Sequence, residues 1–306
     1  MIVYTELETL ENDLGFKSSV LYGVSSNLSR HYVLALLRKP DGSFRHLSVP
    51  DGVLKSIQRA IYEKLLFHMP VSPYATAYRA GSSTYKNALP HCGKKMLLKL
   101  DIHDFFGSIL YSAVKEKAFP EKIYSEPLRV LLTNLCYYND SLPQGAATSP
   151  AIANIIMYDF DMKVGTWCKT KNITYTRYCD DMAFSGDFNV PEVYDFVRRA
   201  LMGEGFYLSY GKTRVLNKDT RQSVTGLIVN EKPSVPRAYR DKLRQELFYM
   251  QKYGILDHMQ KTDIDLSVPE YLQSVLGKVN YVLSVTPDHE GLLNARQWLI
   301  MQLKAQ

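Results

Sequence analysis

The chain has few cysteines, and it has no long hydrophobic run. Four cysteines are scattered along the 306 residues without a Cys-x-x-Cys pair: Cys92, Cys136, Cys168 and Cys179. This spacing argues against a zinc site and against a disulfide framework. No apolar run approaches the roughly 20 residues that a membrane-spanning helix needs, and the acidic segment 1–14 lacks the pattern of a signal peptide. We therefore expect a cytoplasmic protein with no membrane partner.

The sequence also lacks a strong excess of one charge, internal repeats and low-complexity tracts. The formal net charge is +6, a modest basic excess that permits a polyanionic partner without proving one. The length and the ordinary apolar content suit one large domain or two to three small ones.

Two adjacent aspartates are the most informative feature that is present. Asp180 and Asp181 lie between the apolar, β-prone runs 175–179 and 182–185, which predicts a strand, a tight turn and a second strand. Neighbouring like charges repel each other, but a divalent cation held between them and a third carboxylate offsets that repulsion. Asp101, inside an apolar run, offers the third carboxylate.

The alternative is a solvent-exposed hairpin turn, because aspartate is common in turns. For the Asp180-Asp181 dipeptide alone, that interpretation is favoured. It is weakened by Tyr178 and Cys179, which precede the pair, because a hairpin would usually carry Asp-Gly or Asn-Gly at its turn.

A metal site on these residues would suit Mg²⁺, a small hard cation that prefers carboxylates, phosphates and water. Two such ions about 3.5–4 Å apart can assist an in-line displacement at phosphorus. We expect the site to comprise Asp101, Ile102, Asp180 and Asp181, with Mn²⁺ able to replace Mg²⁺. Because 180 − 101 = 79 positions separate the first two aspartates, tertiary structure has to assemble the site.

These residues resemble the motifs of reverse transcriptases. Tyr178–Asp181 resembles their Tyr-x-Asp-Asp box, and 100–106 resembles their first catalytic motif. Leu142–Pro150 resembles the Pro-Gln-Gly segment between the two. The run 211–213 (Gly-Lys-Thr) follows where the family carries a lysine after the metal hairpin.

Two further boxes resemble those of retron reverse transcriptases. Residues 87–91 resemble the Asn-Ala-x-x-His box, and residues 224–226 resemble the Val-Thr-Gly box. The resemblance extends over about 45–229. Cys179 departs from the family pattern, because many relatives carry alanine there, but a small side chain is kept and we expect no loss of activity.

The resemblance implies an α+β fold of the right-hand polymerase type. N-terminal helices and fingers would occupy 1–95, a palm of antiparallel sheet and packed helices 96–230, and a helical thumb 231–306. The hydrophobic pattern itself predicts the following elements: strands over 31–37 and 44–49 joined by a turn at 40–43, helices over 51–69 and 150–164, and helices from 236 onward with a capping box at Ser267 and Glu270.

The resemblance also implies roles around an incoming deoxynucleoside triphosphate. Arg45 would bind its triphosphate, and Phe106 would underlie the sugar and exclude a 2′-hydroxyl. Gln144 and Gly145 would lie against the nascent base pair, and Lys212 near the leaving pyrophosphate. An ordinary surface arginine, a core phenylalanine or a surface lysine remains the alternative at these positions.

A further set is expected at the RNA or the primer. Arg79 is a candidate for template or phosphate contact. Asn87 and His91 either order a turn or contact RNA, and the box of Val224, Thr225 and Gly226 would lie near the primer grip. The basic segment 232–252 can follow a phosphate backbone, with a solvated surface helix as the alternative. Its arginines expected at the nucleic acid are Arg237, Arg240 and Arg244.

The function that these expectations imply is an RNA-directed DNA polymerase of retron type. It would copy a cognate structured RNA, which serves as template and primer, into a branched RNA-linked DNA. It would act with an accessory effector protein in defence against phage. Two alternatives stay open: an RNA-bound scaffold that holds an effector inactive, and a group II intron-like or diversity-generating reverse transcriptase.

Overall fold

The computed structural model describes residues 4–38 and 42–305. Two compact units are present: Met1–Ser82 with Leu98–Val215, and Ser83–Leu97 with Leu216–Gln306. These units do not coincide with the three predicted domains, because Ser83–Leu97 groups with the C-terminal part of the chain. The assignment of fingers, palm and thumb stays a prediction.

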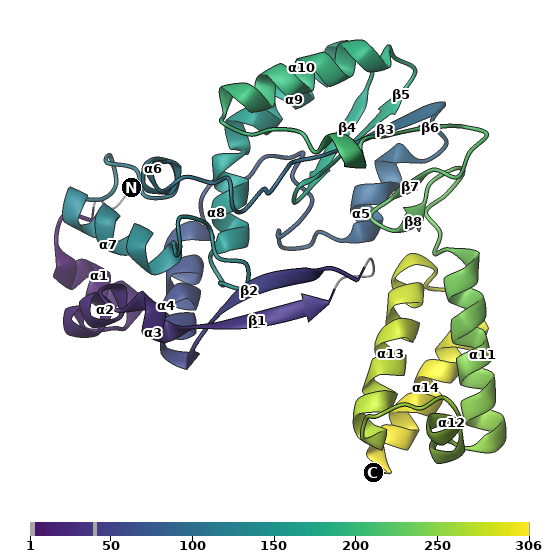
Figure 1. The fold of residues 1–306 in the computed structure, drawn as a ribbon. Coiled ribbons are helices and arrows are strands. Elements are labelled where there is room, and N and C mark those ends of the chain that lie inside the picture. Colours follow the sequence, from purple (N-terminus) through teal and green to yellow (C-terminus); the bar gives the residue numbers. More distant parts are fainter. Residues whose placement is uncertain (1–3, 39–41, 306) are drawn as a thin grey trace. The chain divides into compact units, whose positions relative to one another are not determined.

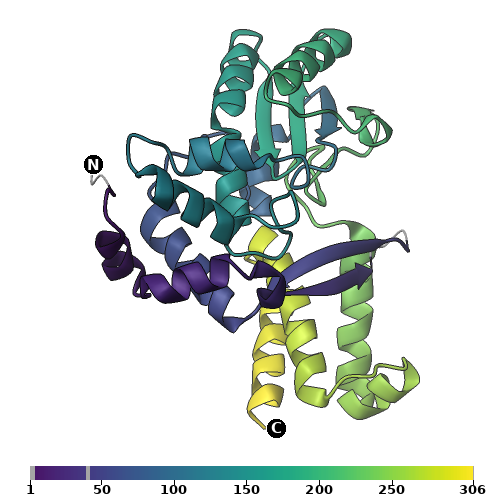
Figure 2. The same ribbon diagram turned by 60° about the vertical axis from the view of Figure 1, so that its left-hand side comes forward.

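The first unit begins with three short helices and a long hairpin. The helices are α1 (Leu7–Leu14), α2 (Ser18–Ser25) and α3 (Leu28–His31). Strands β1 (Tyr32–Arg38) and β2 (Phe44–Pro50) then pair antiparallel from Tyr32↔Pro50 to Arg38↔Phe44, which confirms the predicted hairpin. It extends away from these helices in Figure 2. Part of its predicted turn lies outside the described residues.

The helix expected after the hairpin is confirmed. Asp51 begins it, and its side chain accepts a hydrogen bond from the Leu54 N–H, satisfying a donor that the first helical turn leaves open. The α-helical part is α4 (Gly52–Ile61), which continues as a π-helical turn over Tyr62–Leu66.

The central sheet carries the aspartates. Its strands are β3 (Met96–Asp101), β4 (Thr174–Tyr178), β5 (Asp181–Gly186) and β6 (Arg214–Asn217), in the spatial order β4-β5-β3-β6. Figure 1 shows α9 (Tyr158–Thr170) and α10 (Val190–Gly203) beside this sheet. The antiparallel pairing of β4 and β5 agrees with the predicted α+β class.

The helix predicted over 150–164 is two helices. Helix α8 (Ser149–Ile156) ends at Met157, whose φ of −80° and ψ of 2° interrupt the helical path before α9. Nearby are α6 (Tyr111–Ala113), a π-helical turn over Val114–Ala118 and α7 (Glu126–Cys136).

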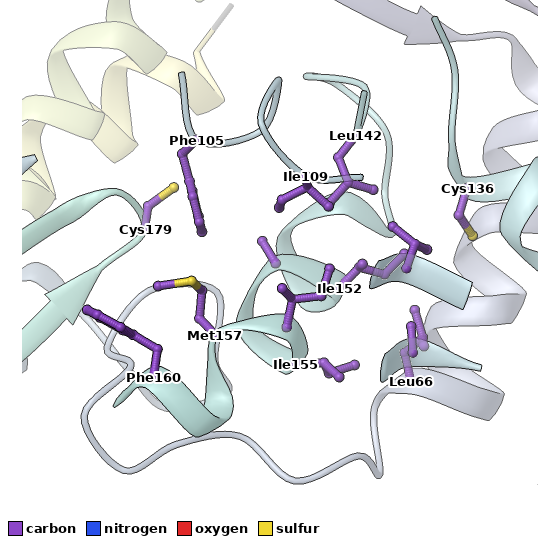
Figure 3. Close-up of a cluster of buried hydrophobic side chains, with 14 of the residues drawn as sticks. Leu66, Phe105, Ile109, Cys136, Leu142, Ile152, Ile155, Met157, Phe160 and Cys179 are labelled. Carbon is purple, nitrogen blue, oxygen red and sulfur yellow. The ribbon is translucent and has the colours of Figure 1, made fainter. Parts of the chain in front are cut away.

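A hydrophobic core of this unit includes the buried face of α8. Figure 3 shows Ile152 of α8 among Ile109 and Leu142, with Phe105 and Cys179 in the same cluster. Cys179 belongs to the tip of the β4–β5 hairpin, so that tip is anchored in the core and is not a freely solvated turn.

The second unit combines a small hairpin with helices. Residues 83–97 supply α5 (Thr84–Ala88) and a 3₁₀ turn over Leu89–His91. The hairpin consists of β7 (Ser223–Val224) and β8 (Leu227–Ile228), and the helices are α11 (Arg237–Tyr253), α12 (Ile255–Lys261), α13 (Val268–Val285) and α14 (Glu290–Lys304). The predicted capping box of Ser267 and Glu270 is confirmed at the start of α13.

Within residues 4–38 and 42–305, every helix is too short or too polar to cross a lipid bilayer.

Candidate active site

The hairpin tip between β4 and β5 carries the two adjacent aspartates. Tyr178 pairs with Asp181, so Cys179 and Asp180 form a two-residue loop, and the predicted tight turn is confirmed. Cys179 has a φ of 61°. This left-handed conformation costs a non-glycine residue roughly 1–2 kcal/mol, and hairpin loops commonly give it to glycine.

Asp101 approaches the tip because β3 lies beside β5 in the sheet. The N–H of Ile102 donates to the carbonyl oxygen of Asp180 over 3.1 Å. The carboxyl groups of Asp101 and Asp181 are close enough for each to shift the pKa of the other. The structure thus brings the three predicted carboxylates together, while their catalytic role stays a prediction.

The three carboxylates make a strongly negative, partly dehydrated site. Burial raises the pKa of Asp101 above its ordinary value, and the charge of Asp180 raises it further, while the hydrogen bond from Lys212 lowers it. Burial also raises the pKa of Asp181, with the positive charge of Lys99 opposing. Both shifts mean that the ionised forms are costly here unless a cation is close.

Lys212 supplies such a cation. It lies in the 3₁₀ turn Tyr210–Lys212, and its Nζ donates to Oδ1 of Asp101 over 2.8 Å. The hydrogen bond raises the pKa of Lys212, whereas the pKa of its partner is raised in spite of the pairing. The difference arises because the Asp101 side chain is 8% exposed among other carboxylates, whereas Lys212 is 62% exposed.

The donor set fits a divalent cation. Within the described part of the chain, no group of three or more His, Cys, Asp or Glu side chains is arranged so that it could hold a metal ion. At the hairpin tip, however, the ammonium group of Lys212 forms an ion pair with an oxygen of Asp101. This position therefore already binds a positive charge. Carboxylate oxygens are the ligands that Mg²⁺ and Mn²⁺ prefer.

A cleft of about 590 Å³ opens beside the aspartates. Predicted site residues that line it with Asp180 and Asp181 are Arg45, Ile102, Phe106, Gln144 and Lys212. Side chains that the sequence analysis did not single out also line it: Phe44, His46, Tyr78 and Asp104. Their proximity could have been inferred in part, because Phe44 and His46 flank Arg45 on its strand and Tyr78 precedes Arg79.

The two adjacent phenylalanines both border the cleft but differ in burial. Phe105 is buried and its ring packs 5.7 Å from that of Phe206. Phe106 is half-buried and lines the cleft. This arrangement leaves Phe106 available to a ligand, as its predicted role requires.

The Pro-Gln-Gly segment lies against strand β2. The N–H of Ser48 donates to the carbonyl oxygen of Gln144 over 2.9 Å. Gly145 has a φ of 125°, and a Cβ there would lie 2.7 Å from the Ser48 carbonyl oxygen. Glycine is therefore required for this packing, whether or not a base pair also approaches.

Arg79 lies apart from the aspartate cleft. It lines a smaller pocket of about 240 Å³ with Tyr62 and Asn154, and its guanidinium donates to the Ser72 carbonyl oxygen over 3.3 Å. It is exposed, so a template or phosphate contact there stays a prediction.

The two retron-like boxes meet inside the second unit. The side-chain amide of Asn87 donates to the Thr225 hydroxyl oxygen over 3.3 Å, and that hydroxyl donates to the Thr84 carbonyl oxygen over 3.3 Å. Thr225 and Gly226 form the two-residue loop between β7 and β8, with φ values of 45° and 83°. Positive φ at both positions is typical of the tightest hairpin turns.

Burial limits which of the predicted RNA-contact residues a nucleic acid could reach directly. Asn87, His91 and Val224 are 2%, 0% and 2% exposed, so their side chains are not presented to a nucleic acid. The bond from Asn87 to Thr225 favours the alternative for Asn87, which is that it orders the segment. Thr225 and Gly226 remain accessible at the hairpin loop.

The predicted arginines of the basic segment share one face of α11. Arg237, Arg240 and Arg244 are exposed and line a cavity of about 950 Å³ together with Phe248 and Trp298. Arg237 and Arg244 also contact the carboxylate of a neighbouring aspartate at 3.4 and 2.7 Å, which offsets part of their charge.

A buried arginine beneath the hairpin tip was missed. Arg177 is fully buried and bound to Asp161, also fully buried. The available signal was a charged residue inside the apolar run that precedes the aspartates, because charged side chains are rarely buried unless they are paired.

Residues 37–231 match the family described as reverse transcriptase (RNA-dependent DNA polymerase). The retron Mx65 reverse transcriptase of Myxococcus xanthus is 33% identical to this chain over 71% of the chain and 56% of that protein. The retron Ec86 reverse transcriptase of Escherichia coli is 28% identical over 69% and 67%, respectively.

The retron Ec73 reverse transcriptase of Escherichia coli is 30% identical, over 72% of this chain and 76% of that protein. The match to the Mx65 protein thus spans little more than half the length of that relative, whereas the match to the Ec73 protein spans three quarters.

Proposed function

Because this chain belongs to the reverse transcriptases, and within them to the retron type, we propose that it is an RNA-directed DNA polymerase. The observation that supports this activity best is the convergence of Asp101 with Asp180 and Asp181, of which the last two line the cleft. A binding scaffold has no need for three carboxylates held close together against their own repulsion.

Reverse transcriptases generally use divalent metal ions. We expect Asp101, Asp180 and Asp181 to hold two Mg²⁺ ions, which Mn²⁺ can replace, with the backbone of Ile102 next to them. When bound, such ions lower the pKa of the attacking hydroxyl and neutralise charge that develops on the phosphate.

The residues around the cleft suit a deoxynucleoside triphosphate. The exposed guanidinium of Arg45 can pair with phosphate oxygens in a bidentate manner. Phe106 offers an aromatic ring in the cleft, and a ring beneath the sugar would collide with a 2′-hydroxyl. Lys212 offers positive charge, and a proton, to the pyrophosphate that leaves. Positioning and charge neutralisation supply most of the rate in phosphoryl transfers.

The finer function follows from the retron-type relatives. We propose that the template and primer are one structured RNA, that the product is a branched RNA-linked DNA, and that an accessory effector protein takes part in defence against phage. The arginine face of α11, with Arg237, Arg240 and Arg244, offers positive charge for the RNA backbone.

The test is the double variant Asp180→Asn with Asp181→Asn. We expect DNA synthesis on the co-purifying RNA to be lost while RNA binding persists, because the amides remove charge without changing shape. Asp219→Asn, at an exposed loop position, is the matched control and should synthesise DNA normally. Synthesis by the double variant would refute the site. Unchanged phage protection without synthesis would favour a scaffold.

A further inference from the structure

A fully buried arginine lies next to the aspartate hairpin. Arg177 is on β4, and its guanidinium donates hydrogen bonds to both carboxylate oxygens of Asp161 on α9 (Nε to Oδ1, 2.9 Å; Nη2 to Oδ2, 2.7 Å). Two parallel bonds of this kind fix the orientation of both groups. The Tyr175 hydroxyl donates to the same Oδ1 over 2.8 Å, so the carboxylate is held from two sides.

The guanidinium also binds the loop that carries the catalytic candidates. Its Nη1 donates to the carbonyl oxygen of Cys179 over 2.9 Å. That carbonyl belongs to the planar peptide group joining Cys179 to Asp180. Holding the carbonyl therefore fixes the plane from which the Asp180 side chain departs.

The same network reaches the wall of the cleft. Nη2 of Arg177 donates to Oδ1 of Asn154 over 3.3 Å, and the Asn154 amide donates to the Ala77 carbonyl oxygen over 2.9 Å. Tyr78 follows directly and lines the cleft together with Cys179. Arg177 thus holds the Cys179 carbonyl directly and reaches the residue before Tyr78 through Asn154.

We propose that Arg177 is a positioning residue for Asp180 and Asp181. It keeps the left-handed loop in the geometry at which both carboxylates meet Asp101, without touching substrate. The inference rests on the proposed polymerase function, because it assumes that the aspartates hold metal ions. A buried ion pair is in itself weak support for a stabilising role, whereas the bond to the Cys179 carbonyl is one that apolar residues could not replace.

The decisive variant is Arg177→Lys. Lysine keeps a positive charge beside Asp161, but its single nitrogen on a flexible stem cannot reproduce the rigid fork that binds Asp161 and Cys179 together. The matched control is Arg129→Lys. Arg129 is another buried arginine, which donates to the Phe119 carbonyl oxygen and to a glutamate over 2.8 Å each, and it does not line the cleft.

Three properties are measured for both variants. The dissociation constant for Mn²⁺ comes from the electron paramagnetic resonance signal of the free ion, the rate from DNA synthesis, and stability from the thermal midpoint. We expect Arg177→Lys to weaken Mn²⁺ binding and to lower kcat by about 10- to 100-fold each, with KM for the deoxynucleotide nearly unchanged. Arg129→Lys should lower only the thermal midpoint.

The proposal is overturned if Arg177→Lys loses stability as the control does but keeps wild-type Mn²⁺ affinity and kcat. If that variant does not fold, Asn154→Ala replaces it, because it leaves the Arg177–Asp161 pair intact and removes one support of the guanidinium. Its Mn²⁺ affinity and kcat should both fall, and unchanged values would also overturn the proposal.

Asp180→Asn separates this inference from the function on which it rests. If Asp180→Asn weakens Mn²⁺ binding but Arg177→Lys does not, only the positioning role is wrong. If Asp180→Asn leaves both Mn²⁺ binding and synthesis unchanged, the proposed metal site itself is wrong.

Discussion

The ammonium nitrogen of Lys212 lies 2.8 Å from a carboxylate oxygen of Asp101, 111 positions away in the chain. Because the lysine is largely exposed and the aspartate is not, the lysine can leave the pair more readily than the aspartate can. It then remains beside the cleft as a free positive charge.

Lys212→Met should therefore separate metal binding from chemistry. We expect kcat to fall by about 100-fold or more, the scale seen when one electrostatic donor is removed from an active site. Mn²⁺ binding should not weaken, since the ammonium group competes for Asp101. Single-turnover synthesis and Mn²⁺ titration measure the two effects. Weaker Mn²⁺ binding at unchanged kcat would instead mean that Lys212 only organises the aspartates.

Lys115→Met is the matched control for that experiment. Lys115 pairs with Glu126 at 2.7 Å and does not line the cleft, so its loss should leave both the rate and Mn²⁺ binding unchanged.

Phe106→Val should relax the choice of sugar. The smaller side chain would leave room for a 2′-hydroxyl, so the ratio of kcat/KM for deoxynucleotides over ribonucleotides should fall by about 10- to 100-fold. Incorporation of each nucleotide on the same template measures this ratio. Phe105→Leu alters the buried neighbour and should lower stability without changing the ratio. Equal ratios in both variants would contradict the role of Phe106.

Gly145→Ala should destabilise the first unit. The substitution combines an unfavourable φ of 125° with a Cβ 2.7 Å from the Ser48 carbonyl oxygen, and strain of this kind costs about 1–3 kcal/mol. Urea unfolding measures the loss. Gly203→Ala is the control, because a Cβ there meets nothing within 4 Å, and alanine is the better helix former. Equal stability of wild type and Gly145→Ala would show that the segment can shift.

His91 should make the free energy of unfolding fall in mild acid. Burial lowers its pKa from 6.5 to about 4, with the charge of Lys94 adding to the effect. Between these values the unfolded chain binds a proton that the folded chain does not, so stability falls as the pH is lowered through this window. The full contribution is roughly 3 kcal/mol, from about 2.5 pKa units at 1.36 kcal/mol each.

His91→Gln should remove that part of the pH dependence, whatever it does to absolute stability. The measurement is the urea midpoint between pH 4 and pH 7. His68→Gln, at an exposed histidine, should retain the wild-type pH dependence. Persistence of the dependence in His91→Gln would assign it to another group.

The elements that could be predicted are those whose signals are local. The β4–β5 hairpin follows from apolar runs on either side of Asp180 and Asp181, and the capping box follows from Ser267 and Glu270 three positions apart. The convergence with Asp101 could be inferred only because unscreened adjacent carboxylates are unfavourable, so a third partner had to be sought elsewhere in the chain.

The features that were not predicted depend on distant contacts. Arg177 and Asp161 meet only when α9 packs against β4, and periodicity says nothing about such a pair. The interruption at Met157 lies between two helices that each have a buried face, and neither Met157 nor its two neighbours is a glycine or proline that would indicate it. The burial of His91 depends on how residues 83–97 pack with their own unit, which the sequence does not reveal.

The grouping of residues 83–97 with residues 216–306 has a practical consequence for dissecting the protein by truncation. A fragment that stops at residue 215 keeps Asn87 but lacks Thr225, and keeps Gly93 but lacks Val229, to whose carbonyl oxygen the Gly93 N–H donates over 3.0 Å. In such a fragment, residues 83–97 would lack the partners that they have in the whole chain. A loss of activity in the fragment would therefore say little about the helices removed. A cut placed before Arg237 would spare both pairings.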